Sequence, residues 1–161
     1  MENDFRICGM IFHGHGIPGV HAIAIGQWRA DDDDPPESYD EDGYFDPYIV
    51  ALNEKYEPIC PNGKPLDQYN EDEEENCRIE KQMKAYVSKR FDERMRLTFG
   101  NDLKAFILVK HWHGDQVLAI VGREVIPVNA DQFDRIQRLY NYHSGIPFVV
   151  GELCWHEFIQ F

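Results

Sequence analysis

Three pairs of side chains in this sequence have the residue types and the spacing that metal ions select. Each pair places two ligands two residues apart: His13 with His15, His111 with His113, and Cys154 with His156. Residues i and i+2 of a strand point to the same face, and zinc takes His nitrogen and Cys sulfur. One hypothesis is therefore a zinc-dependent enzyme or a zinc-stabilised domain. The other is that polar imidazoles gather at strand ends and turns.

Carboxylates form the second candidate site, because the acidity of the chain is concentrated in one segment. Residues 31–75 hold 17 Asp and Glu against two Lys, a net charge of −15, whereas the remaining residues sum to +2. Such a field repels nucleic acid and anionic lipid, and it attracts basic proteins or cations. The predicted partner-binding residues are the carboxylates of two runs: Asp31, Asp32, Asp33, Asp34, Glu37, Asp40, Glu41, Asp42, Asp46, Glu71, Asp72, Glu73, Glu74 and Glu75.

Several interpretations of the acidic segment stay open. It is a solvated loop, or it folds onto the basic residues between Arg78 and Arg96 in pairs worth about 0–1 kcal/mol each. A calcium loop over residues 38–49 is a third interpretation, although Ser38 and Ile49 stand where an EF-hand-like loop has its first and last ligands. The fourth is a surface that occupies the basic cleft of a nucleic-acid-binding protein. Such clefts are lined with Lys and Arg to match the phosphate charge of DNA.

The sequence favours a binding protein over an enzyme. It contains no G-x-S-x-G, P-loop or G-x-G-x-x-G pattern, and Cys8 and Cys154 lie in apolar strand sequence, where a thiol is normally inert. No cofactor is expected unless zinc is bound. The predicted partner is a basic protein, such as a nuclease or another nucleic-acid-binding protein, with no direct contact to nucleic acid or membrane. The predicted action is inhibition, in the manner of a nucleic-acid mimic, an anti-defence protein or an immunity protein.

A third class of function is a structural subunit of a viral or other assembly. The apolar residues at 154–161 could form an edge between subunits of a homo-oligomer. The expected compartment is the cytoplasm, since no apolar run approaches the roughly 20 residues that span a bilayer. The first residues also lack the basic and apolar regions of a signal peptide. The four cysteines are scattered and are expected to be free, mostly buried thiols.

The strands and helices that the sequence predicts, which must position these residues, are expected to form one α+β domain over residues 1–161. We expect a mainly antiparallel sheet built from hairpins, two helices packed on one face, and a long acidic loop segment. Strands are predicted at 5–12, 20–28, 48–52, 103–112, 116–121, 124–128 and 147–159. A helix is predicted at about 74–99, where Ile79, Met83, Val87, Phe91 and Met95 recur at four-residue steps. A second helix is predicted to begin after Asn129 as its N-cap.

Overall fold

The computed structural model describes residues 4–110, 114–140 and 144–152. Contacts divide the chain into two compact units, the first with residues 1–87 and 138–143 and the second with residues 88–137 and 144–161. Helix α1 (Glu73–Phe99) contributes its first half to one unit and its second half to the other. The prediction of a single domain stays a prediction. None of the described helices has an apolar stretch long enough to cross a membrane.

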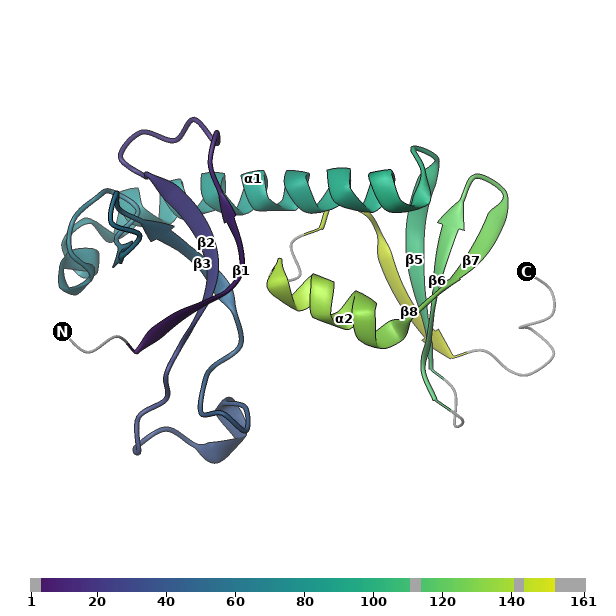
Figure 1. The fold of residues 1–161 in the computed structure, drawn as a ribbon, viewed down its shortest axis with the longest axis horizontal. Helices are drawn as coiled ribbons and strands as arrows, with labels where there is room; N and C mark the ends of the chain where they lie inside the picture. Colours follow the sequence, from purple (N-terminus) through teal and green to yellow (C-terminus); the bar gives the residue numbers. More distant parts are fainter. Residues whose placement is uncertain (1–3, 111–113, 141–143, 153–161) are drawn as a thin grey trace. The chain divides into compact units, whose positions relative to one another are not determined.

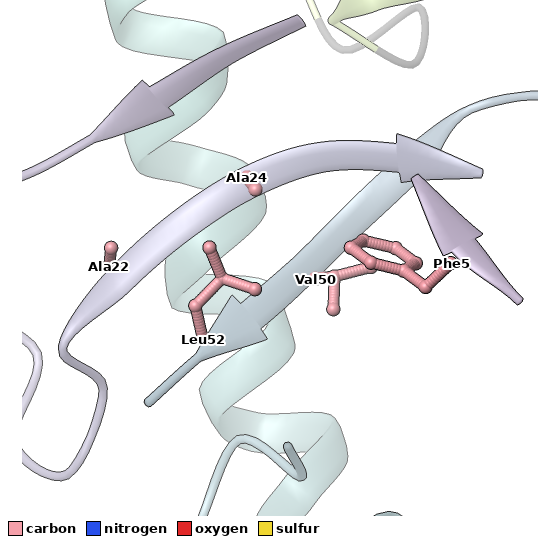
Figure 2. Close-up of a cluster of buried hydrophobic side chains, with 5 residues drawn as sticks. All are labelled: Phe5, Ala22, Ala24, Val50 and Leu52. Atoms are coloured by element: carbon pink, nitrogen blue, oxygen red, sulfur yellow. The ribbon is translucent and has the colours of Figure 1, made fainter. Parts of the chain in front are cut away.

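The first unit contains an antiparallel sheet of four strands in the order β1-β2-β3-β4. These are β1 (Phe5–Phe12), β2 (Ala22–Trp28), β3 (Tyr48–Leu52) and the short β4 (Pro58–Ile59). Ala22 pairs with Leu52 and Ala24 with Val50, so the four side chains share one face. With Phe5 they form a buried apolar cluster (Figure 2). The alternate residues Ile23, Ile25 and Ala51 are buried as well, so both faces of this strand pair are covered.

Strand β1 bends because it carries more residues than the strand beside it (Figure 1). Ile7 pairs with Gly26 and Ile11 pairs with Ala24, so β1 uses four steps where β2 uses two. Gly9 lies inside this bulge, and a Cβ there would come within 3.0 Å of the Cβ of Ile25. Glycine therefore permits the close approach of the two strands at this point.

The second unit contains a sheet in the order β7-β6-β5-β8. Its elements are β5 (Leu103–Lys110), β6 (Gln116–Val121), β7 (Glu124–Val128), helix α2 (Ala130–Leu139) and β8 (Phe148–Glu152). All pairs are antiparallel except β5 with β8. The ring of Phe133 lies 4.5 Å from Phe106 and stacks at 5.2 Å on Phe148, so α2 packs on this sheet. Figure 1 shows α2 beside these strands.

The α+β class, built mainly from antiparallel hairpins with two helices, is confirmed. The strands form two sheets, where one was expected, because the long helix separates two sets of hairpins along the chain. The predicted apolar stripe of α1 is buried along its whole length. The Oδ1 atom of Asn129 accepts a 3.0 Å hydrogen bond from the Gln132 N–H, as an N-cap does. Residues 111–112 and 153–159 of the predicted strands lie outside the described residues.

Candidate partner-binding surface

The first acidic run lies in the loop that joins β2 to β3 and extends beyond the ends of these strands (Figure 1). Backbone hydrogen bonds close its base: the Ala30 N–H donates to the Gly43 oxygen at 2.8 Å, and the Phe45 N–H donates to the Trp28 oxygen at 3.0 Å. A single turn, η1 (Pro36–Ser38), lies within it. The loop is thus held at both of its ends by main-chain contacts.

Asp40 organises the interior of this loop. Its Oδ1 accepts hydrogen bonds from the backbone N–H groups of Asp42 at 3.0 Å and Tyr44 at 2.9 Å. Its Oδ2 pairs with the Arg6 guanidinium at 3.5 Å. The same guanidinium lies over the Tyr44 ring, 3.7 Å from the ring centroid. One carboxylate and one cation therefore connect the loop to the edge strand β1.

Arg6 is itself held in place by a neutral side chain. Its Nε donates a 2.8 Å hydrogen bond to Oε1 of Gln27, whose side chain is buried in β2. The Nε2 of Gln27 donates to the backbone oxygen of Phe45, also at 2.8 Å. A buried amide that uses both its ends can orient a cation without adding charge. Apart from Asp40, no carboxylate of residues 31–46 takes part in these contacts of Arg6 and Gln27.

The second acidic run lies where the 3₁₀ helix η2 (Leu66–Asp72) passes into α1. Asn76 is fully buried there; its Oδ1 accepts from the Asn62 N–H at 3.0 Å, and its Nδ2 donates to the Tyr69 oxygen at 3.1 Å. Asp72 pairs with Lys64 at 2.6 Å and accepts from the Asn62 side chain at 3.2 Å. These contacts tie η2 and the preceding turn to the helix.

Glu73, Glu74 and Glu75 form the first turn of α1 and are exposed. Carboxylates at this end of a helix interact favourably with its macrodipole. Only Glu75 has an ion-pair partner among the described residues, Arg78, at 3.9 Å on the same helix. With Glu71 and Asp72 these residues line one side of a shallow surface depression. The helix start therefore shows successive carboxylates to solvent.

Twelve of the fourteen predicted partner-binding carboxylates are exposed, and only Asp34 and Asp72 are partly buried. Among the described residues, no ion pair joins residues 31–46 to Arg78, Lys81 or Lys84 of the same unit. The carboxylates can therefore reach another molecule without first leaving a partner on this part of the helix.

His13, the first of the predicted metal ligands, belongs to a cluster that the sequence did not reveal. Its Nε2 is hydrogen-bonded to the Tyr56 hydroxyl at 3.1 Å, and its ring lies 5.7 Å from that of His21. Tyr56 has a φ of 61°, which is uncommon for a residue with a side chain. Because Ala22 pairs with Leu52, His21 and the turn that follows β3 lie at the same end of this strand pair. Only that register, and no local motif, could have revealed the cluster.

His15 makes different contacts from His13. Its Nδ1 accepts a 2.9 Å hydrogen bond from the Ile17 N–H, and its ring meets Tyr86 edge-on at 6.1 Å. In the described part of the chain, no three His, Cys, Asp or Glu side chains are arranged to hold a metal ion. The predicted ligands His111, His113, Cys154 and His156 lie outside that part. A zinc site stays a prediction.

The three cysteines that the structure describes are free thiols. Cys60 is buried and donates to the Pro65 oxygen at 3.1 Å, whereas Cys8 is partly buried and Cys77 is exposed. Burial raises the pKa of both Cys8 and Cys60, which keeps these thiols protonated and poorly nucleophilic. Cys154 lies outside the described residues.

Comparison with known proteins yields nothing similar: no family model, no curated protein and no solved structure matches the chain. What this surface can bind therefore has to follow from its own carboxylates. Carboxylates held at fixed positions accept strong hydrogen bonds from ammonium and guanidinium groups. What the two acidic runs can do chemically is bind cationic groups.

Proposed function

We propose that this protein is a non-enzymatic binding protein that inhibits a basic, nucleic-acid-binding partner by covering its cationic face. The two acidic runs, in the β2–β3 loop and at the start of α1, make the contact. They act as a nucleic-acid mimic, presenting carboxylates where the partner would otherwise meet phosphates.

The observation that carries the proposal is an ordered acidic loop whose charge is exposed. Of its nine predicted carboxylates, only Asp40 takes part in an ion pair among the described residues. Order matters as much as charge, because a mobile loop loses conformational entropy when it binds. The contacts of Asp40, Arg6 and Gln27 already hold residues 40–45 of this loop, which reduces that loss.

Charge complementarity of this kind acts mainly on the association rate and on the choice of partner. The carboxylates steer a cationic surface toward the protein, and added salt screens that attraction over about 10 Å at 0.1 M. Binding to the partner is therefore expected to weaken steeply as the salt concentration rises.

The test uses two variants with equal loss of charge. The loop variant carries Asp32→Asn, Asp33→Asn and Glu41→Gln, and the helix variant carries Glu73→Gln, Glu74→Gln and Glu75→Gln. The control carries Glu54→Gln, Asp115→Asn and Glu124→Gln, three exposed positions outside both runs. Partners are captured from a lysate of the source organism at two salt concentrations. Each is then purified and its Kd for every variant is measured by calorimetry.

The proposal expects a captured protein that binds duplex DNA or RNA and is released from this chain by the same nucleic acid. The loop and helix variants should bind it about tenfold or more weakly at low salt, and the control should bind as the wild type does. Equal Kd values for all variants contradict the proposal. So does a partner that binds nucleic acid and this chain at the same time.

A further inference from the structure

An apolar pocket of about 360 Å³ lies in the first unit, and several of its lining residues flank the two acidic runs in the sequence. Its walls come from the end of β2, from β3, from η2 and from α1, and they include three aromatic rings: Trp28, Tyr48 and Tyr69. The volume falls in the range of sites that hold small ligands. Trp28 immediately precedes the acidic loop, Tyr48 follows it, and Tyr69 precedes the acidic start of α1.

Among the described residues, one carboxylate, Glu80 of α1, lines this otherwise apolar pocket, and no Lys or Arg does. None of the ion pairs among the described residues involves Glu80. The Tyr69 hydroxyl is hydrogen-bonded to the Cys77 sulfur at 3.5 Å, and its interactions with Cys77 and Glu80 raise the pKa of Tyr69. The hydroxyl therefore stays protonated and can orient the carboxylate, which keeps further lone pairs for another donor.

The same molecule shows how such groups hold a cation. Arg6 of β1 lies over the Tyr44 ring of the acidic loop, and its guanidinium pairs with Asp40 of the same loop. An aromatic face and a carboxylate together thus bind a guanidinium within this chain. The pocket contains the same two kinds of group, Glu80 and three aromatic rings, but none of the cationic residues that the structure describes lines it.

We infer that this pocket receives one arginine side chain of the basic partner, with the guanidinium against Glu80 and an aromatic face. The inference rests on the proposed function, because it makes the pocket an anchor within the acidic surface. Arginine fits better than lysine, since a planar guanidinium stacks on aromatic rings and pairs with a carboxylate through two parallel bonds. Its methylene stem covers the apolar wall that Met83 and Leu66 provide.

The probe is a capped tripeptide, acetyl-Gly-Arg-Gly-amide, titrated into the ¹⁵N-labelled full chain. Its matched control carries citrulline, which has the same shape as arginine without the charge. The arginine peptide should shift the indole N–H signal of Trp28 in a saturable way at millimolar concentration, and the citrulline peptide should not. Glu80→Gln should weaken this binding about tenfold. Tyr48→Leu should weaken it several-fold, because the Tyr48 ring is more exposed than those of Trp28 and Tyr69.

Glu54→Gln is the matched protein control, because it removes one charge from an exposed position of the same unit outside the pocket. It should bind the arginine peptide as the wild type does. No saturable shift at Trp28 overturns the inference, and so does equal binding by Glu80→Gln and Glu54→Gln. If Glu80→Gln unfolds, the comparison of Tyr48→Leu with the wild type decides in its place.

A nona-arginine peptide separates failure of the pocket from failure of the proposed function. If only the pocket is wrong, nona-arginine binds Glu80→Gln as it binds the wild type, and the loop and helix variants still bind it less well. If the proposed function is wrong, the captured partner binds those two variants as tightly as it binds the control, whatever nona-arginine does. The tripeptide then still reports whether the pocket holds a guanidinium.

Discussion

The two acidic runs carry nine carboxylates in the loop and five at the start of α1, and they are built differently. In the β2–β3 loop, a carboxylate does the structural work, since Asp40 accepts two backbone hydrogen bonds and pairs with Arg6. At the start of α1, a neutral amide does it, since the buried Asn76 connects the turn at Asn62 to η2. Charge and structure are thus coupled at Asp40 in the loop, and also at Asp34, whose Oδ2 accepts from the Asp31 N–H at 2.8 Å. In the second run they are coupled at Asp72 and separate at Glu73 and Glu74.

This difference tells an experimenter which charges can be removed without damage. A variant that neutralises the loop must keep Asp40, or it will lose binding and local structure together. A variant of the helix start can lose Glu73, Glu74 and Glu75, because none of the hydrogen bonds of Asn76 depends on them. The following changes test the comparison, from the largest expected effect to the smallest.

Asn76→Ala should have the largest effect on stability. It leaves the Asn62 N–H and the Tyr69 oxygen without their partner in a buried place, which costs about 2–4 kcal/mol in the free energy of unfolding. Urea unfolding followed by circular dichroism measures it. Glu54→Gln, at an exposed position outside both runs, is the control and should stay within about 0.5 kcal/mol of the wild type. A loss below about 1 kcal/mol for Asn76→Ala would show that the amide does not hold the run.

Asp40→Ala should cost less, about 1–2 kcal/mol, because the carboxylate is partly solvated and water replaces some of its bonds. Its effect should be local: faster hydrogen exchange at the amides of Asp42 and Tyr44, with little change in the core strand β3. Glu41→Ala, at the exposed neighbouring position, is the control. Unchanged exchange at Asp42 and Tyr44 in the Asp40 variant would remove the proposed role of this carboxylate.

The smallest effects should come from the exposed charges, and they should differ in sign between the runs. Neutralising any one of Glu73, Glu74 and Glu75 loses a favourable interaction with the helix dipole, about 0.3–1 kcal/mol at low salt. Neutralising Asp32 and Asp33 relieves repulsion and should leave stability unchanged or slightly higher. Urea unfolding at 20 mM and 500 mM salt checks this, because screening should shrink both effects. A destabilising loop variant would contradict the comparison.

Local patterns in the sequence predicted the elements well. The stripe from Ile79 to Met95 repeats at helical spacing, and all five of its side chains are buried. Asn129 precedes an amphipathic run and caps its helix. Both signals lie within a few residues of the structure they predict, so one sequence suffices to detect them.

Features that depend on distant pairing could not be predicted in this way. The parallel pairing of β8 with β5 joins residues about 40 positions apart. The sequence of a strand does not show which other strand it pairs with. Arg6 stacks on Tyr44 only because the register of β1 and β2 and the closed loop bring them together. Asn76 gave no signal either, since a polar residue on a helix is normally exposed.

The bulge in β1 also affects what happens at high protein concentration. β1 lies at the border of the first sheet as the structure describes it, and its Ile7 and Ile11 side chains are partly exposed. A straight, apolar border strand is a template on which another chain can add a strand, which is a common route to aggregation. The extra residues between Ile7 and Ile11 interrupt the regular spacing of hydrogen-bonding groups that such an addition needs. The bulge at Gly9, which bends β1, therefore also disfavours the addition of a strand from another chain at this edge of the sheet.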